Sequence, residues 1–229
     1  MTMKKKRPVL QDVADRLGVT KMTVSRFLRN PEQVSEALGQ RIAVVLDELG
    51  YIPNRVPEIL SNATSKAIAV LLPSLTNHVF ADVLKGIETV NDAAGYQTLV
   101  AHFGYQAEKE ERQLRSLLGW NVDGVILTER THTPATLRML ETAGIPVVEI
   151  MDSVSPCLDM AVGFDNTEAA RQMAETLIRR GYRSTVYLGA RLDERTIQKQ
   201  QGYQRAMQEA GLEPLSVMSA TPSSFTTGA

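Results

Sequence analysis

The spacing of apolar residues changes once along the chain, between residues 53 and 66. Before this segment, apolar residues recur every three or four positions, which is the period of an amphipathic helix. After it, short apolar runs typical of buried strands alternate with helical patterns. Pro53 and Pro57, with Ser61 and Thr64, mark a linker between the two patterns. We therefore expect a helical domain over residues 1–52, a hinge over 53–66, an α/β domain over 67–212 and a Ser/Thr-rich tail over 213–229.

The N-terminal domain is expected to contain three helices. The first ends at Gly18, because glycine readily takes the left-handed conformation that closes a helix. Its apolar stripe consists of Leu10, Val13, Ala14 and Leu17. Thr20 is a good N-cap for the second helix, and Ser35 is expected to cap a third helix that ends at Gly50. Gly39 lies inside this third helix and should weaken it by about 1 kcal/mol relative to alanine.

The second helix has an exposed face with chemistry suited to DNA. Val24, Phe27 and Leu28 share the inward stripe, which leaves polar and basic side chains on the opposite side. An arginine such as Arg26 can donate two hydrogen bonds to guanine O6 and N7, and Met22 can contact a thymine methyl group. The alternative interpretation is a basic helix on an ordinary solvated surface. We expect DNA contacts from Lys21, Met22, Thr23, Ser25, Arg26 and Arg29.

The distribution of charge supports DNA binding over the ordinary surface. Residues 1–30 contain eight Lys and Arg residues against two acidic residues, whereas residues 61–229 contain 15 basic and 19 acidic residues. The net charge of -1 therefore hides a cationic N-terminal segment. A polyanion would be attracted to that end of the chain only.

The larger domain has the pattern of a doubly wound parallel sheet. Its expected strands are 67–72, 96–101, 124–127, 147–150, 161–164 and 185–188, and helical patterns fill the gaps between them. Ligands of such sheets bind at the carboxyl ends of strands. Candidate ligand-binding residues therefore follow the strands directly: Ser74, Asn77, Phe80, Thr128, Asp152, Asp165 and Asn166.

Two long segments resemble the LacI/GalR family of transcriptional repressors. Residues 9–28, VLQDVADRLGVTKMTVSRFL, and residues 34–55, VSEALGQRIAVVLDELGYIPNR, are similar to the DNA-binding headpiece of that family. Residues 70–88, VLLPSLTNHVFADVLKGIE, and 162–166, VGFDN, are similar to its sensor domain. The resemblance implies a helix-turn-helix headpiece joined to a periplasmic-binding-protein-like α/β domain.

The resemblance also implies partners. It suggests a homodimer on a pseudo-palindromic operator, with further DNA contacts from Asn54, Arg55 and Leu60. A short helix over Pro57 to about Ser61 would be disordered until it packs against a partner hinge and the minor groove, where Leu60 would wedge between base pairs. Without the resemblance, Leu60 would be read as an interdomain packing residue.

A small-molecule effector, a sugar acid such as gluconate, is expected to relieve repression. Lys199 stands where the family carries an effector-contacting arginine, and a lysine can pair with a carboxylate only as a point charge. Asp152 matches a family acid that binds ligand hydroxyls, and Phe80 matches an aromatic residue of the cleft. The alternatives are that Asp152 caps a loop and that Phe80 belongs to the core.

Other functional classes lack support in the sequence. It contains no dinucleotide-binding, P-loop, serine-hydrolase or zinc-protease motif, so no enzyme activity, cofactor or metal is expected. His78, His102 and His132 have no metal-ligand spacing and are expected in loops or on the surface. A sugar-binding protein without DNA function is the alternative, but the basic N-terminus and the absence of a signal peptide favour a cytoplasmic regulator.

The C-terminal segment departs from the family pattern. Relatives continue well beyond this point, whereas residues 213–229, EPLSVMSATPSSFTTGA, show almost no core pattern. The second lobe of the sensor domain would then consist of little more than residues 185–210. We expect such a lobe to leave sheet edges and apolar faces uncovered.

Overall fold

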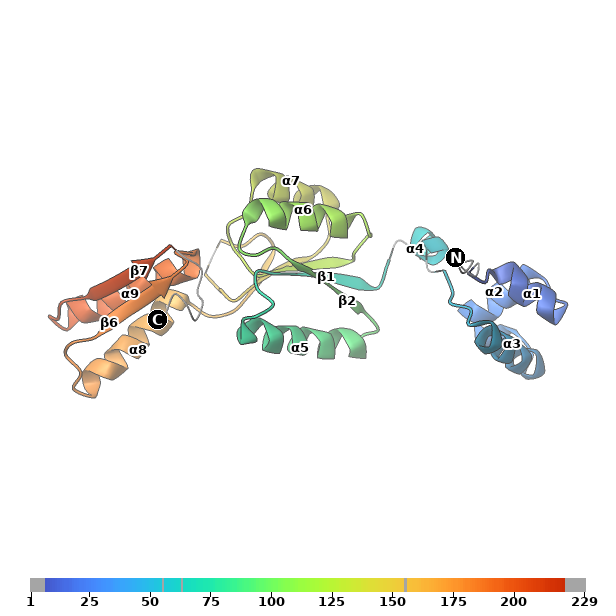
Figure 1. Ribbon diagram of the computed structural model, residues 1–229, viewed down its shortest axis with the longest axis horizontal. Coiled ribbons are helices and arrows are strands. Elements are labelled where there is room, and N and C mark those ends of the chain that lie inside the picture. The colour runs from blue at the N-terminus through green and yellow to red at the C-terminus, as the bar shows by residue number, and fades with distance from the viewer. Residues whose placement is uncertain (1–6, 55, 63, 155, 221–229) are drawn as a thin grey trace, which may run out of the picture. The chain divides into compact units, whose positions relative to one another are not determined.

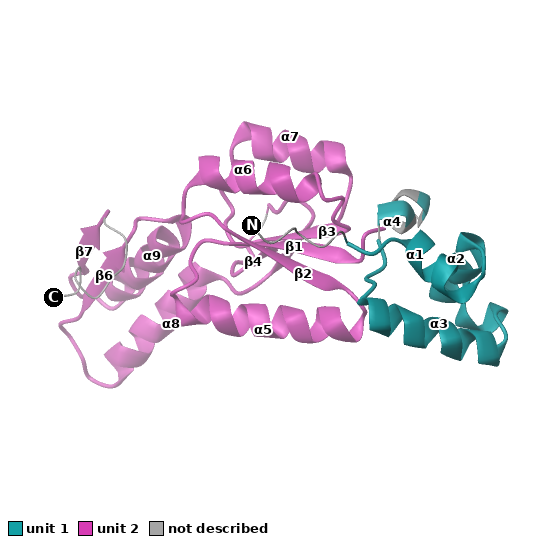
Figure 2. Ribbon diagram, turned by 45° about the vertical axis from the view of Figure 1, so that its right-hand side comes forward, with its two compact units in different colours: residues 1–63 teal, residues 64–229 magenta. Residues whose placement is uncertain are grey.

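The computed structural model describes residues 7–54, 56–62, 64–154 and 156–220. The chain divides into two compact units, residues 1–63 and 64–229, which are coloured separately in Figure 2. Each unit has its own apolar core, so each can be described by itself.

The first unit is a small helical domain. Its helices are α1 (Leu10–Leu17), α2 (Lys21–Arg29), α3 (Glu36–Leu49) and α4 (Val56–Asn62), with a single 3-10 turn at Pro31–Gln33. Val13, Ala14, Val24 and Ile42 are completely buried where α1, α2 and α3 meet. The predicted ends of α1 and α3 are confirmed, because Gly18 and Gly50 both adopt the left-handed conformation.

The helix caps and Gly39 differ in part from expectation. Thr20 caps α2 as predicted, since its Oγ1 accepts a hydrogen bond from the amide of Thr23 at 3.2 Å. Ser35 occupies the N-cap position of α3, but its side chain makes no capping hydrogen bond. Gly39 is buried, and a Cβ there would lie 3.1 Å from Cε2 of Phe27. The glycine therefore lets α3 approach Phe27 closely, which offsets its low helix propensity.

The second unit begins with a parallel sheet, which confirms the predicted fold class. Strands β1 (Ala67–Leu72), β2 (Gln97–His102), β3 (Gly124–Leu127), β4 (Val147–Ile150) and β5 (Met160–Val162) lie in the order β2-β1-β3-β4-β5. All four pairings are parallel. The strands at 67–72, 124–127 and 147–150 have the predicted bounds, and β2 and β5 differ by one or two residues.

Helices cover both faces of this sheet. Figure 1 shows α5 (His78–Ala93) on one face and α6 (Ala107–Leu118) and α7 (Pro134–Ala143) on the other. Phe80 of α5 packs against Val70 and Leu72, whereas Leu114 of α6 belongs to the core that contains Leu71. Strand β1 is thus buried from both sides, which explains its continuous apolar sequence.

The second lobe is larger than the sequence suggested. It comprises α8 (Asn166–Arg179), β6 (Val186–Ala190), α9 (Glu194–Glu209) and β7 (Leu215–Ser219), and β6 pairs with β7 in parallel. Its core contains Ala174 of α8 and Met207 of α9. The expectation that residues 213–229 form only a tail is therefore wrong for 215–219. Apolar residues alternate there at Leu215 and Val217, and the edge of β6 supplies the partner that a lone segment lacks.

A close approach between helices holds this lobe together. A Cβ on Gly202 of α9 would lie 1.9 Å from the carbonyl oxygen of Thr167 in α8, so only glycine fits at the crossing. The other side of the lobe is open: Val186, Leu188, Leu215 and Val217 are between 43% and 72% exposed in the described part of the chain.

Candidate DNA-binding surface and effector site

Helix α2 separates a buried face from a basic exposed face. Val24 is completely buried, whereas Lys21, Arg26 and Arg29 are exposed and Met22 is 67% exposed. The helical period that buries Val24 in the core therefore places the predicted base-contacting side chains on the exposed face of α2, where DNA can reach them.

Two predicted contact residues of α2 are also used within the helix. Thr23 is partly buried, and its Oγ1 lies 3.0 Å from Oγ1 of Thr20, next to the N-cap hydrogen bond. Ser25 accepts a hydrogen bond from a guanidinium nitrogen of Arg29 at 3.3 Å. This bond orients Arg29 along the exposed face and leaves its other N–H groups available.

The predicted hinge forms the short helix α4. Asn54 lies just before it, and its side-chain oxygen accepts a hydrogen bond from the amide of Val56 at 3.1 Å. Leu60 lies within α4. Arg55 lies outside the described residues, so its predicted DNA contact stays a prediction. At seven residues, α4 is shorter than the roughly 12 to 15 that an isolated helix needs for stability.

In the second unit, the first strand is followed by a polar turn. Ser74 accepts a hydrogen bond from the amide of Asn77 at 3.2 Å, and Asn77 caps α5 by accepting one from the amide of Val79. Both side chains are partly exposed. Phe80 is only 3% exposed and packs in the core, which agrees with the alternative interpretation of this residue.

The two predicted acidic ligands differ in burial. Asp152 follows β4, is 1% exposed and accepts a hydrogen bond from the amide of Val154 at 2.8 Å. Asp165 is exposed and caps α8 by accepting a hydrogen bond from the amide of Glu168 at 2.9 Å. A Cβ on Gly163 would lie 2.3 Å from the nitrogen of Asp152, so glycine is needed beside that aspartate.

Residues that the sequence analysis missed connect the strand ends of the two lobes. Arg195 of α9 donates hydrogen bonds to the carbonyl oxygen of Thr128 at 2.9 Å and to Glu129 at 2.6 Å, just after β3. Arg191, just after β6, lies over the ring of Tyr105, with 3.9 Å between guanidinium and ring centroid. Tyr105, Glu129 and Arg191 all follow strands, so the rule that selected Asp152 could have selected them too.

This junction contains buried polar atoms that lack hydrogen-bond partners in the described part of the structure. They are Oη of Tyr105, Oδ1 of Asn166, Oε1 of Gln198 and Nε of Arg191. Asn166 is tied to the same region, because its side-chain nitrogen donates to the carbonyl oxygen of Met151 at 3.2 Å. Buried polar atoms are normally paired, so such a group points to a polar ligand or to ordered water.

Backbone strain collects at the same junction. Tyr105, Met151, Arg191 and Leu192 have φ values of 59°, 78°, 76° and 52°. Residues other than glycine rarely adopt this backbone conformation, because it costs of order 1–3 kcal/mol. Such residues are frequent at ligand sites. The strain gives a second, independent reason to place a binding site here.

The electrostatics of the junction combine cations with a buried acid. Burial raises the pKa of Glu129 to about 7, although Arg195 opposes this shift. Burial also lowers the pKa of Lys199, and the neighbouring Arg195 lowers it further. Lys199 therefore lies near Arg195, in a region where a ligand anion would relieve the crowding of positive charge.

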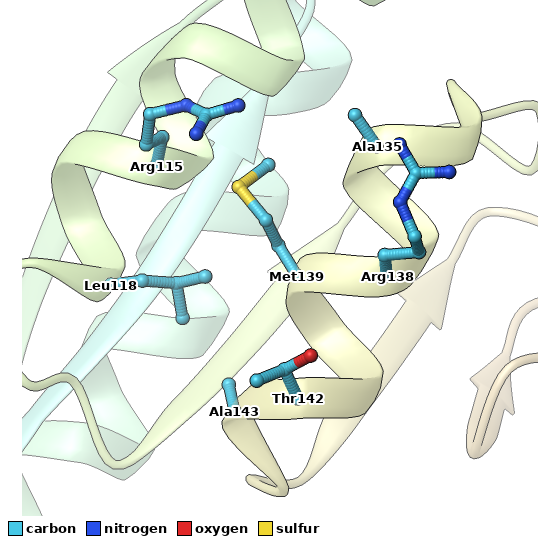
Figure 3. Close-up of a pocket in the computed structure, with 7 residues that line it drawn as sticks. All are labelled: Arg115, Leu118, Ala135, Arg138, Met139, Thr142 and Ala143. Carbon is cyan, nitrogen blue, oxygen red and sulfur yellow. The ribbon is translucent and has the colours of Figure 1, made fainter.

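Other features of the described residues do not suggest a different activity. A groove of about 610 Å³ lies between α6 and α7, where Figure 3 shows Met139 between the two helices, but no candidate effector residue lines it. In the part of the chain that the structure describes, no group of three or more His, Cys, Asp or Glu could hold a metal ion. No described helix is both long and apolar enough to span a bilayer.

The three histidines differ in burial. His78 and His102 lie at an end of α5 and of β2, but the side chain of His132 is 1% exposed and packs between two glutamates. His132 lies in a loop, as one of the two predicted positions requires, but its side chain is buried. Its partners are distant in sequence, so no local signal could show this.

Comparison with known proteins agrees with both units. Residues 9–54 match the family model described as "Bacterial regulatory proteins, lacI family". Residues 65–225 match the model described as "Periplasmic binding proteins and sugar binding domain of LacI family". The second match extends over β7, in agreement with its place in the second lobe.

Individual relatives are similar over almost the whole chain. The HTH-type transcriptional regulator GntR of Escherichia coli K12 is 72% identical over 226 residues, which cover 99% of this chain and 68% of GntR. The regulator IdnR of the same organism is 47% identical, over 93% of this chain and 64% of IdnR.

A solved structure has the same arrangement of elements. The crystal structure of a LacI-family regulator from Silicibacter pomeroyi has a TM-score of 0.88 and 37% identity, over 96% of this chain and 67% of that protein. The chain thus spans about two thirds of the length of these relatives. From the two matched domains and the 72% identity to a named regulator, we conclude that the chain belongs to the LacI family of bacterial transcriptional regulators.

Proposed function

We propose that the protein represses transcription by binding an operator as a homodimer and that a sugar acid such as gluconate releases it. In this proposal, residues 1–52 form the DNA-binding headpiece, residues 53–66 the hinge, and the α/β domain from residue 67 the effector sensor. The observation that carries the proposal is the basic exposed face of α2, which lies opposite the buried Val24 in a LacI-family headpiece. The cytoplasm, where the operator is found, is the proposed location.

The exposed face of α2 supports reading of base edges. Arg26 and Arg29 are exposed, and the guanidinium group of each can donate hydrogen bonds to O6 and N7 of a guanine. Met22 is also exposed and can contact a thymine methyl group. The proposed DNA contacts are Lys21, Met22, Thr23, Ser25, Arg26 and Arg29 of α2, with Asn54, Arg55 and Leu60 of the hinge. One headpiece buries too little surface for tight specific binding, so two copies on a two-fold symmetric site are needed.

The junction between the two lobes supports binding of a small polyhydroxy acid. Lys199, Arg191 and Arg195 bring positive charge to this junction, and Asp152 and Asn166 offer hydrogen-bonding groups. A carboxylate would pair with the cations, and hydroxyl groups would satisfy the unpartnered polar atoms. The proposed effector contacts are Ser74, Asn77, Phe80, Asp152, Asp165 and Lys199. We propose Tyr105 and Arg191 in addition, because each has a buried polar atom without a partner among the described residues.

Fluorescence anisotropy tests both parts of the proposal. A labelled operator selected from a random duplex pool is titrated with the protein at physiological salt, first alone and then with gluconate. We expect the operator to bind at least about 1,000-fold more tightly than a random duplex. Gluconate should weaken operator binding and leave the weak random binding unchanged.

The two parts can fail separately. No preference for any duplex would reject the DNA-binding proposal. A clear preference that gluconate does not alter would reject the sugar-acid proposal and leave DNA binding intact. Glucose, which has similar hydroxyl groups and no carboxylate, serves as the matched control ligand and should have no effect.

A further inference from the structure

Four charged side chains form a buried cluster beside β4 that the proposed function does not use. Glu110 comes from α6, Arg130 and His132 from the loop between β3 and α7, and Glu149 from β4. The side chains of Glu110, His132 and Glu149 are 1–2% exposed, and that of Arg130 is 12% exposed. Charged groups are rarely buried to this extent unless they are paired, so the four side chains must be considered together.

The imidazole of His132 lies between the two carboxylates. Its Nδ1 is 2.7 Å from Oε2 of Glu110, and its Nε2 is 3.7 Å from Oε1 of Glu149. Nε of Arg130 lies 3.3 Å from the same oxygen of Glu149. With His132 protonated, the cluster contains two acids and two cations and carries no net charge. Neutrality minimises the cost of burying these groups.

The cluster holds the loop that follows β4 at two places. The second oxygen of Glu149 accepts a hydrogen bond from the amide of Leu158 at 2.6 Å. The guanidinium group of Arg130 donates to the carbonyl oxygen of Val154 at 2.5 Å and also to that of Pro156. All three bonds are charge-assisted, which makes them stronger than hydrogen bonds between neutral groups.

This loop carries Asp152, and the connection to it is direct. The amide of Val154 donates to Oδ1 of Asp152, while the carbonyl oxygen of the same residue accepts from Arg130. Any movement of Val154 would therefore move the Asp152 carboxylate, which is itself 1% exposed.

We infer that Glu110, Arg130, His132 and Glu149 act as positioning residues for the effector site, because their hydrogen bonds hold Val154, Pro156 and Leu158 in place and thereby orient Asp152 for the ligand. The inference rests on the proposed function in one respect, which is the role of Asp152 as an effector contact. None of the four residues is required to touch the ligand.

The arrangement makes the loop sensitive to protonation of His132. The charged groups that face the imidazole are Glu110 from α6, Glu149 from β4 and Arg130 from its own loop. Glu111, the neighbour of Glu110, bonds instead to Oγ1 of Thr133. Burial disfavours the imidazolium, but the hydrogen bond to Glu110 and the charge of Glu149 outweigh burial and raise the pKa of His132.

The sign of the pH effect follows from this shift. The folded-state pKa of His132 is above its ordinary value of about 6.5. The protonated imidazole therefore stabilises the cluster fully below about pH 6.5. This stabilisation is lost as the pH rises through the raised pKa of the folded state. The loop should therefore be best ordered, and effector binding tightest, on the acidic side of that pKa.

Glu149→Gln in the full chain tests the inference, with Glu108→Gln, which changes an exposed residue of α6, as the matched control. Hydrogen exchange is measured at the amides of Val154 and Leu158, and gluconate affinity is measured by calorimetry from pH 6 to pH 9. Glu149→Gln should speed exchange at both amides and weaken gluconate binding, each about tenfold, because a buried charge-assisted hydrogen bond is lost. Operator affinity without gluconate should stay within about twofold of wild type, and Glu108→Gln should change none of these quantities.

A second variant keeps the test decisive if Glu149→Gln does not fold. Arg130→Lys retains the charge but has one nitrogen in place of the two by which Arg130 contacts Glu149 and the carbonyl oxygens, and it should speed exchange at Val154. His132→Gln should reduce the pH dependence of gluconate affinity, and the dependence due to Glu129 should remain. Unchanged exchange at both amides in a folded variant would overturn the inference, whether or not gluconate binds. Failure of gluconate to bind the wild type would instead reject the proposed effector, and the exchange measurements would still decide the positioning role.

Discussion

Single side chains of α2 have separate tasks. Val24 is completely buried in the headpiece core, Thr20 caps the helix, and Arg26 is exposed. The apolar spacing of the sequence was sufficient to assign these tasks, because a helix of known phase places each residue on a known face. The bond from Arg29 to Ser25 required the structure, since it depends on side-chain conformation.

Arg26→Ala should reduce operator affinity by about 1–3 kcal/mol and relax specificity at one base pair, because it removes a guanidinium group that can donate two hydrogen bonds to guanine. Arg41→Ala, on the exposed surface of α3, is the charge-matched control and should weaken operator and random duplex by similar factors. Binding to a library of single-base operator variants measures both. Equal losses on operator and random duplex for Arg26→Ala would show that Arg26 contacts only the backbone.

Glu129 should make the stability of the protein depend on pH. Burial raises its pKa to about 7 in spite of the 2.6 Å contact with Arg195. The pKa of Glu129 is higher in the folded than in the unfolded protein, so the protonated carboxyl group favours the folded state. This contribution to the free energy of unfolding is complete below about pH 4.5 and is lost as the pH rises through about 7. The loss for this group is at most about 3 kcal/mol.

In the wild type, the free energy of unfolding should decrease between pH 5 and pH 8 as Glu129 ionises. Glu129→Gln should make this decrease smaller. Urea denaturation at several pH values measures this free energy. Glu209→Gln, whose carboxylate is half exposed and paired with Arg205, is the control and should retain the wild-type pH dependence. A wild-type slope in Glu129→Gln would mean that the Glu129 carboxylate is ionised throughout this range.

Among the elements, the helices of the headpiece were predicted best and the last strand worst. Glycines at 18 and 50 mark the ends of α1 and α3 in the sequence itself. Strand β7 has only Leu215 and Val217 as alternating apolar residues within a Ser/Thr-rich segment, and its pairing with β6 exists only in the folded protein. A strand obtains its hydrogen bonds from another segment, whereas a helix obtains them internally.

The short helix α4 should form fully only on DNA. Its seven residues are too few for an isolated helix, so the hinge amides should exchange rapidly in the free protein and be protected on the operator. Leu60→Ala should preserve the folded headpiece and reduce operator bending, if Leu60 wedges between base pairs. Circular-permutation gel mobility measures the bend. Val56→Ala, which changes an exposed residue of α4, is the control and should preserve it; an unaltered bend in Leu60→Ala would reject the wedge.

At the scale of the whole molecule, the second lobe presents an apolar strand face. Leu188 is 72% exposed and Val217 is 55% exposed on adjacent strands. Apolar residues gathered on an unpaired strand face promote association of protein molecules. This chain should consequently bind a hydrophobic dye and form species larger than the proposed homodimer as its concentration rises.

Replacing both residues, as Leu188→Thr with Val217→Thr, should reduce dye binding and self-association while retaining β propensity. Sedimentation velocity measures the association. Met173→Gln removes an exposed apolar side chain from α8 in the same lobe and is the control. If the double variant associates as strongly as wild type, the responsible surface lies elsewhere.

The sequence was sufficient to predict the helices of the headpiece, most strands and helices of the α/β domain and the basic face of α2. These features depend on residues that are close in the chain, where a fixed period decides which side chains share a face. Only the tertiary structure decided which polar groups meet, such as His132 with Glu110 and Glu149, or Arg191 with Tyr105. Hydrogen bonds and burial depend on distances through space, and segments far apart in the sequence acquire those distances only when the chain folds.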